Sequence, residues 1–244
     1  GASFVCPTIF PCGTNPSLIS VWNPLQIPSA SPSRSFSSFS TASCSFAFRN
    51  AVAKNFAEPS VVIGYDSRIK SDIFAKVAAG VFVVNGIKVN IWSTLMPVPT
   101  VSYATRYLHT SAGVMITASH NPSKYNGYKV YGADGCQITS EAAADILSEI
   151  EKLNIFADVR IGDFEAGVKD GNIQYISDEV YTAFVNEVKN QSVLFGEEIN
   201  KNVAIVYSPL NGTGLKPVTR TLKEMGYTNM MIQGFIGIGL LIIS

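Results

Sequence analysis

The sequence predicts an α/β fold. We expect a mixed, mostly parallel sheet between helices over residues 58–190, and the beginning of a second, similar α/β unit over residues 203–244. Two observations support this prediction. Strand-like and helix-like segments alternate from residue 58 onward, and such an order produces parallel strands joined by helical crossovers. The segment 113–117 (GVMIT) carries apolar residues on both faces, as a strand does when helices cover both sides of its sheet.

The first half of this unit is expected to hold three strands and two helices. A β-branched run at 61–63 predicts the first strand. A helix follows, because apolar residues recur with the helical period, Ser71 can cap its start and Gly86 stops it. The expected elements, in order, are strand 61–63, helix 71–85, strand 87–92, helix 100–108 and strand 113–117.

The second half begins with a predicted turn at Asn126 and Gly127, a pair that favours tight turns between strands. Ser140 can cap the next helix, and Glu141 suits the positive end of that helix dipole. Residues 191–202 have the character of a linker. The further expected elements are strand 128–131, helix 140–154, helix 177–190, strand 203–207 and a helix that ends near Met225.

The composition argues against polyanionic and membrane partners. The 244 residues carry 18 Lys and Arg against 18 Asp and Glu, so no net field attracts nucleic acid or an acidic membrane. The apolar run 230–244 is shorter than the roughly 20 residues that a membrane-spanning helix needs. The four cysteines form no C-x-x-C pair, which favours a reducing compartment. We therefore expect no nucleic-acid partner, no membrane partner and a cytoplasmic location.

Residues 1–57 differ from the rest and are expected to be disordered. They are rich in Ser and Pro, and prolines interrupt helices. Arg34 and Arg49 supply positive charge, and no acid precedes Glu58. This composition is typical of an organellar transit peptide, which would make the location organellar. Translated non-coding sequence or a disordered tail is the alternative interpretation.

A polar loop follows the 113–117 strand and reads Thr-Ala-Ser-His-Asn-Pro at 117–122. Ser119 lies just past the strand end, where α/β sheets commonly carry their chemistry. Three interpretations remain open. A loop serine often hydrogen-bonds its own backbone. A serine hydrolase would need a G-x-S-x-G elbow and a distant histidine, whereas this loop does not match and His109 lies at a helix end. The third interpretation is a serine that carries a phosphoryl group.

A resemblance favours the third interpretation. Residues 117–122, together with 125–131 (YNGYKVY), resemble the active-site signature of the α-D-phosphohexomutases, the family of phosphoglucomutases and phosphomannomutases. The resemblance extends from about Val61 to Asn229 and is strongest toward the branch with bacterial phosphoglucomutases and phosphopentomutases. Three further segments share it: 65–68 (YDSR), 96–100 (MPVPT) and 208–214 (SPLNGTG).

The resemblance implies a reaction and a set of roles. Family members move phosphate between carbons of a sugar phosphate through a phosphoserine and a bound Mg²⁺, with a sugar bisphosphate as activator. Ser119 would be the phosphoserine and, through its phosphoryl oxygen, a metal ligand. His120 and Lys129 would do the acid–base work, and Asn121 and Lys129 would bind substrate. Lys129 could act as a base only if burial or neighbouring cations lower its pKa.

Four other residues that follow predicted strands are either charged or glycine, and we prefer a structural role for each of them. Asp66 and Arg68 follow the first strand and could form an ion pair with each other. Gly212 and Gly214 could cradle a phosphate, but two glycines after a strand more commonly form the turn itself.

The family's Asp-x-Asp-x-Asp metal loop has no counterpart here, because no two aspartates are separated by a single residue. The family's Arg-Gly motif is missing before residue 58, and both ends of the chain are expected to be out of register with the true gene. The main expectation is a phosphohexomutase that acts on glucose or mannose phosphates. The alternatives are a catalytically inactive fragment that lacks the metal and sugar loops, and a phosphopentomutase.

Overall fold

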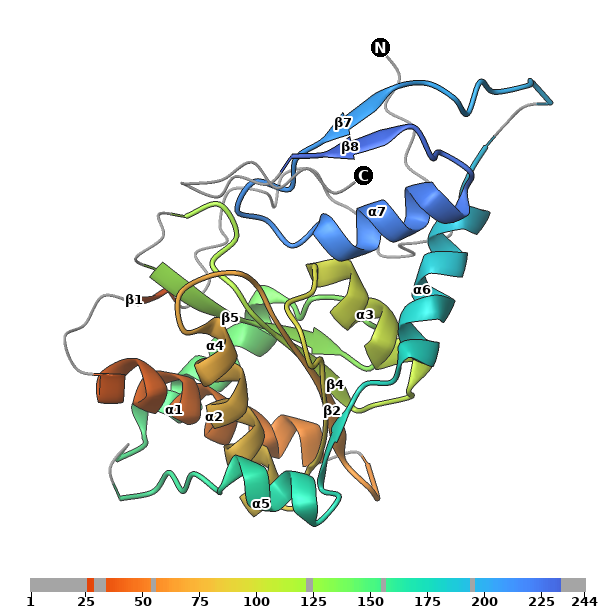
Figure 1. Cartoon of the computed structure of the whole chain (residues 1–244). Helices are drawn as coiled ribbons and strands as arrows, with labels where there is room; N and C mark the ends of the chain where they lie inside the picture. The colour runs from red at the N-terminus through yellow and green to blue at the C-terminus, as the bar shows by residue number, and fades with distance from the viewer. Residues whose placement is uncertain are drawn as a thin grey trace.

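The structure contains two α/β units, of which the larger is built on a six-stranded sheet (Figure 1). This computed structural model describes residues 26–28, 34–53, 56–121, 125–154, 157–193 and 196–233. The strand order is β1-β5-β4-β2-β3-β6. The strands are β1 Gln26–Pro28, β2 Ser60–Tyr65, β3 Lys88–Ile91, β4 Ala112–Ile116, β5 Tyr125–Gly132 and β6 Ile173–Tyr175.

The sheet is mixed, as predicted. Strand β2 runs parallel to β3 and β4, and β3 runs parallel to β6. Strand β5 is antiparallel to both β4 and β1. Val61, Val62 and Ile63 of β2 are all fully buried, which is the signature of a central strand covered on both faces.

Helices cover both faces and complete a three-layer α/β/α arrangement (Figure 1). On one face Phe74 and Phe82 belong to an apolar cluster with residues of the sheet, and on the other face Val101 and Tyr181 belong to a second cluster. The helices of the first face are α1 Arg34–Ala53, α2 Ser71–Val84, α4 Ser140–Glu151 and α5 Phe164–Lys169. Those of the second face are α3 Val98–Tyr107 and α6 Asp178–Asn190. The predicted fold class is confirmed.

The expectation of disorder over residues 1–57 is wrong for residues 34–53, which form α1. Cys44 and Phe48 of this helix are buried in the first apolar cluster, and the Phe48 ring meets the Phe82 ring edge-to-face at 6.4 Å between centroids. The Ser45 hydroxyl lies 2.9 Å from the Tyr128 hydroxyl of β5. Tertiary burial thus overrides the weak helix propensity of a Ser-rich segment. Residues 1–25 lie outside the described residues.

The predicted tight turn at Asn126 and Gly127 is also wrong, because both residues lie inside β5. Asn126 is fully buried, and its side-chain amide donates to the Ser71 hydroxyl at 2.8 Å. The side-chain carbonyl oxygen of Asn126 accepts from the Gly127 backbone amide at 2.9 Å. A Cβ atom on Gly127 would lie 2.6 Å from the Thr117 carbonyl oxygen, so the glycine permits a close approach of two strand ends rather than a turn.

Two predicted helix caps shift by one residue. Lys70, in a left-handed conformation, precedes α2, and Ser71 is its first helical residue. Thr139, rather than Ser140, caps α4 and accepts from the Ala142 amide at 3.3 Å. Helix α5 and strand β6 lie in a stretch where the sequence predicted no element, because both are too short to show a clear period.

The second unit is small and docks on α6 (Figure 1). It consists of the parallel strands β7 Ile205–Tyr207 and β8 Met230–Ile232, with α7 Leu215–Glu224 between them. Lys189 of α6 forms an ion pair of 2.6 Å with Glu224 of α7. The division of the chain at residues 58, 191 and 203 stays a prediction. Within the described part of the chain, no helix has the length and apolar character needed to cross a membrane.

Candidate functional site

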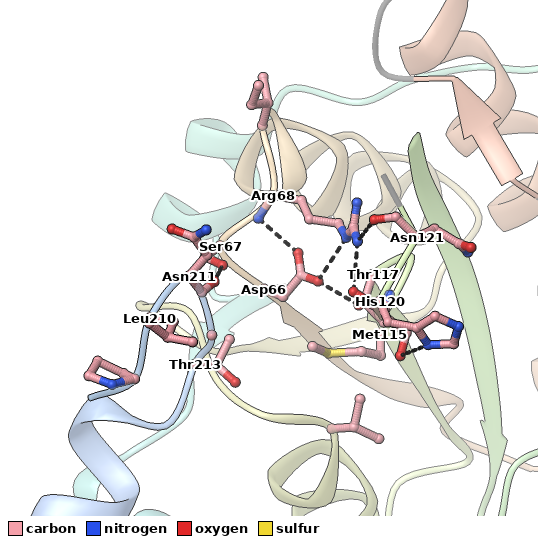
Figure 2. Close-up of a pocket in the computed structure, with 15 residues that line it drawn as sticks. Asp66, Ser67, Arg68, Met115, Thr117, His120, Asn121, Leu210, Asn211 and Thr213 are labelled. Atoms are coloured by element: carbon pink, nitrogen blue, oxygen red, sulfur yellow. Dashed lines mark hydrogen bonds and ion pairs between the residues drawn. The ribbon is translucent and has the colours of Figure 1, made fainter. Parts of the chain in front are cut away.

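The loop that follows β4 faces an open cleft between the two units (Figure 2). The cleft has a volume of about 1130 Å³. One wall consists of the ends of β2 and β4 with the start of α3, and the other is the loop that precedes α7. The lining residues that the site uses are Asp66, Arg68, Thr117, Ser119, His120 and Asn121 on the first wall, and Pro209–Thr213 on the second.

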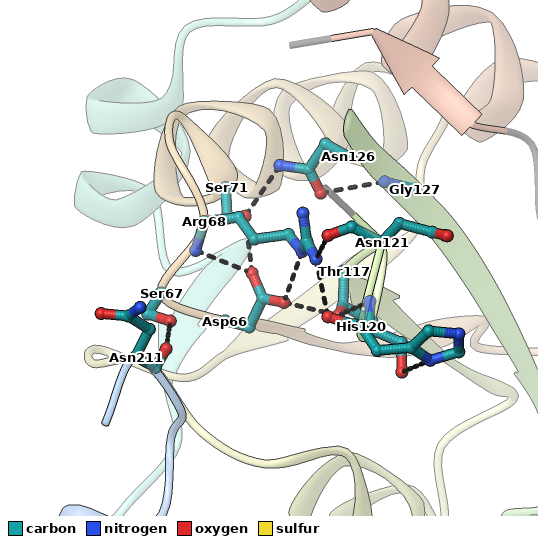
Figure 3. Close-up of polar contacts among 11 residues, drawn as sticks. Asp66, Ser67, Arg68, Ser71, Thr117, His120, Asn121, Asn126, Gly127 and Asn211 are labelled. Atoms are coloured by element: carbon teal, nitrogen blue, oxygen red, sulfur yellow. Dashed lines mark hydrogen bonds and ion pairs between the residues drawn. The ribbon is translucent and has the colours of Figure 1, made fainter. Parts of the chain in front are cut away.

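Parallel pairing of β2 and β4 brings two distant segments to one edge of the sheet. Tyr65 pairs with Ile116, so both strands end at the same level. The Asp66 amide continues the ladder by donating to the Ile116 carbonyl at 3.2 Å. The turn 66–68 and the loop 117–121 therefore lie side by side where parallel strands commonly place functional groups (Figure 3).

Ser119 lies at the exposed end of the loop with its backbone held from both sides. Its φ of 55° is left-handed, a region that non-glycine residues seldom occupy. Its amide donates to the Thr117 hydroxyl at 2.9 Å, and its carbonyl accepts from Arg68 Nη2 at 2.7 Å. The Ser119 hydroxyl lies 3.5 Å from His120 Nδ1, a long distance for a hydrogen bond. The hydroxyl is the part of the residue left for chemistry in the cleft.

Asp66 is the centre of the polar contacts around this loop (Figure 3). Its Oδ1 accepts from the Arg68 amide at 3.0 Å and from the Ser71 hydroxyl at 2.9 Å. Its Oδ2 accepts from the Thr117 hydroxyl and lies 3.6 Å from Arg68 Nε. The expected ion pair between Asp66 and Arg68 is confirmed. The guanidinium also donates to the Asn121 carbonyl, so it spans the serine loop.

Three of the four predicted site residues meet in the cleft. Ser119, His120 and Asn121 line it. Lys129 does not line it, but it pairs with Met115 across β4 and β5 and so projects from the same face of the sheet as that lining residue. Burial lowers the pKa of Lys129, and the nearby Asp66 charge partly opposes this effect. This is the direction that acid–base use of a lysine requires.

The sequence did not predict the roles of Thr117 and the loop 209–213. Thr117 belongs to the motif, but its hydroxyl donates to Asp66, a residue 51 positions earlier in the sequence. Ser67 donates to the Asn211 carbonyl and so links the two walls of the cleft. The Gly212 amide donates to the Pro209 carbonyl at 2.8 Å, which confirms the turn interpretation of that glycine.

The described residues do not fit a magnesium site. Among them, no group of three or more His, Cys, Asp or Glu side chains is placed to hold a metal ion. Asp66 is the acidic side chain among the lining residues of the cleft, and both of its oxygens already accept protein hydrogen bonds. Mg²⁺ needs several oxygen ligands in near-octahedral geometry. No step of the chemistry below is therefore assigned to the ion.

The layers and the loop define a three-layer α/β/α domain with an exposed serine at the end of a central strand, and comparison with known proteins identifies its family. Residues 34–155 match the sequence model described as phosphoglucomutase/phosphomannomutase, alpha/beta/alpha domain I. The chain belongs to this family. Because the match starts at residue 34, the family resemblance begins earlier than the start at about Val61 that the sequence predicted.

Individual relatives agree with this assignment. A phosphoglucomutase of Staphylococcus haemolyticus is 37% identical over 174 residues, covering 71% of this chain and 31% of that protein. A protein of Schizosaccharomyces pombe named probable phosphoribomutase is 36% identical over 185 residues, covering 72% of this chain and 30% of that protein. The chain thus spans about a third of the length of these curated relatives.

The solved structures support the fold. The open form of parafusin, a phosphoglucomutase of Paramecium, superposes with a TM-score of 0.61 at 14% identity, covering 81% of this chain and 39% of that one. At this identity the likeness concerns the fold alone.

Proposed function

We propose that Ser119 is the phosphoryl-carrying residue of a phosphomutase reaction on a hexose phosphate. The observation that carries the proposal is the presentation of Ser119. Both polar groups of its backbone are engaged by the protein, while its hydroxyl faces an open cleft large enough for a sugar phosphate. The name of the staphylococcal relative supports glucose phosphates as the substrate, and the family description adds mannose phosphates.

The proposed step begins with a sugar bisphosphate in the cleft. The Ser119 oxygen attacks one phosphorus atom, a new Oγ–P bond forms, and the bond from that phosphorus to the sugar oxygen breaks. The serine proton leaves and the sugar oxygen gains a proton, so the products are phosphoserine and a sugar monophosphate. Phosphate moves along the sugar when phosphoserine first gives its phosphoryl group to the free hydroxyl of a sugar monophosphate, the bisphosphate so formed turns over in the cleft, and Ser119 then takes the phosphoryl group from the other sugar oxygen by the step above.

Two side chains are proposed for the proton movements. His120 Nδ1, 3.5 Å from the serine oxygen, can take the hydroxyl proton when that nitrogen is unprotonated. Lys129, with its lowered pKa, would protonate the sugar oxygen or bind a phosphate oxygen. Asn121 would contact the sugar phosphate from the same loop.

Mg²⁺ and a sugar bisphosphate are the cofactors proposed for the whole reaction. A divalent ion neutralises charge on a phosphoryl group during transfer. Among the described residues, no group of three or more His, Cys, Asp or Glu side chains is placed to hold such an ion, so Mg²⁺ is proposed for the reaction and not assigned to ligands of this chain.

The test is to locate the phosphate. The chain is incubated with glucose 1,6-bisphosphate, and separately with mannose 1,6-bisphosphate, in a buffer with Mg²⁺, and then mapped by peptide mass spectrometry. We expect one phosphoryl group on Ser119, its loss in Ser119→Ala, and unchanged labelling in Ser148→Ala, which alters a remote serine on α4. A phosphoryl group on another residue, or none in the wild type, would overturn the proposal.

A further inference from the structure

We propose that Asp66, acting through Thr117 and Arg68, is the positioning residue that holds Ser119 in its left-handed conformation and so aims its hydroxyl into the cleft. The inference deepens the proposed function and rests on it. It concerns the backbone of the serine, so it can be tested with or without phosphate transfer.

The hydrogen bonds of the Thr117 hydroxyl have a fixed direction. A hydroxyl has one proton to donate. Thr117 gives its proton to the Asp66 carboxylate, which can only accept, and the threonine oxygen is then left to accept from the Ser119 amide at 2.9 Å. The charge of Asp66 thereby fixes which way the Thr117 hydroxyl points. An uncharged amide at position 66 could donate as well as accept and would not impose this direction.

On the other side of the serine residue, Arg68 holds the Ser119 carbonyl. Arg68 Nη2 donates to the Ser119 carbonyl at 2.7 Å, and the same nitrogen donates to the Asn121 carbonyl. Arg68 Nε lies 3.6 Å from the Asp66 carboxylate, whose charge holds the guanidinium in place. Asp66 therefore contacts both side chains that fix the Ser119 backbone, the Thr117 hydroxyl and the Arg68 guanidinium (Figure 3).

Asp66 is itself held by hydrogen bonds that lead into the core. The Ser71 hydroxyl donates to Asp66 at 2.9 Å and in turn accepts from the Asn126 amide at 2.8 Å, so its direction is also set. Asn126 and Ser71 are fully buried, and Thr117 is 3% exposed. Hydrogen bonds that follow one another in such a buried series are strong and reinforce one another. This series of hydrogen bonds runs from β5 through the start of α2 to the serine loop, and it connects the loop to the core.

The choice of variants separates positioning from general stability. Thr117→Val keeps the size of the side chain and removes the hydroxyl, whereas Thr117→Ser keeps the hydroxyl. Thr105→Val is the matched control, because Thr105 is buried like Thr117 and its hydroxyl donates to the Val101 carbonyl, away from the serine loop.

The deciding measurement is the backbone of Ser119 in solution. Carbon chemical shifts and amide hydrogen exchange are recorded by NMR for the full chain and for the three variants. We expect left-handed shifts and a protected Ser119 amide in the wild type, in Thr117→Ser and in Thr105→Val. In Thr117→Val we expect both to be lost, while signals of the β2 and β4 core are retained. An extended Ser119 in the wild type, or an unchanged Ser119 in Thr117→Val, would overturn the inference.

Labelling by glucose 1,6-bisphosphate gives the functional consequence. We expect Thr117→Val to label about ten to a hundred times more slowly at saturating bisphosphate, with a half-saturating concentration close to that of the wild type, because misplacement of a reacting group affects the step and not the binding. Thr117→Ser should restore the rate. If the wild type takes up no phosphate, the proposed function fails, and the NMR comparison still decides whether the Thr117 hydroxyl, which links Asp66 to the Ser119 amide, positions the serine.

Discussion

The two walls of the cleft differ in how they are held. The serine loop follows β4, which is paired on both sides within a six-stranded sheet, and Thr117 and Ala118 at its start are buried. The loop 209–213 follows β7, which belongs to a two-stranded sheet. Val206 in β7 is 66% exposed, and Met231 beside it in β8 is 53% exposed.

The contacts that orient the second wall are polar and lie near the surface. Lys189 and Arg220 both contact Glu224, where α6 meets α7. Ser67 reaches the Asn211 carbonyl across the cleft. The serine is thus fixed by the buried core of one unit, whereas the opposite wall is placed by a few polar contacts near the surface.

The largest expected difference between the walls is in stability. Phe74 in α2 is fully buried in the cluster beneath the serine wall, so Phe74→Ala should lower the free energy of unfolding by about 3–5 kcal/mol. Leu215 at the start of α7 is 48% exposed, and Leu215→Ala should cost about 1 kcal/mol or less. Urea unfolding followed by circular dichroism measures both. Equal losses would show that the second wall is packed as tightly as the first.

A smaller effect is expected where α1 meets the sheet. Ser45→Ala removes the partner of the buried Tyr128 hydroxyl and should cost about 1–3 kcal/mol. The double variant Ser45→Ala with Tyr128→Phe removes both polar groups and should recover much of that loss in the same urea experiment. A neutral single variant would mean that the Ser45–Tyr128 hydrogen bond does not stabilise the packing of α1 on the sheet.

The smallest effect should be a pH dependence confined to the second wall. Hydrogen bonds from Lys189 and Arg220 lower the pKa of Glu224 below its ordinary value of 4.5. At acidic pH the folded state therefore binds fewer protons at Glu224 than the unfolded state does. The contribution of Glu224 to the free energy of unfolding is complete above pH 4.5, and it is lost as the pH falls through the lowered pKa of the folded state.

Hydrogen exchange of peptides from residues 203–233 and 58–121 should detect this loss. We expect faster exchange at acidic pH in the second region only, and no such pH step in Glu224→Gln. The same step in both regions, or its persistence in Glu224→Gln, would assign it to other groups.

The sequence predicted most of the sheet unit from residue 58, because buried strands and a periodic helix leave clear local patterns. It also predicted that Ser119 would lie just past the end of a strand with two apolar faces, and the structure has the serine just after the buried strand β4. It could not reveal α1, where Ser45 is stabilised by a tyrosine 83 positions away. Nor could it reveal Asp66 as the support of the serine loop, since its contact with Thr117 spans 51 positions. Asn126 was misread as a turn residue because its partner, Ser71, is 55 positions away.

The most direct test of the account is whether phosphate on Ser119 can return to a sugar. Chain phosphorylated on Ser119 is incubated with glucose 6-phosphate and Mg²⁺, or with Mg²⁺ alone, and the serine phosphate and glucose 1,6-bisphosphate are followed by phosphorus NMR. We expect the sugar to accelerate loss of phosphate from Ser119 and an equal amount of bisphosphate to appear. Loss to water at the same rate with and without the sugar would contradict the assignment of Ser119 as a phosphoryl carrier.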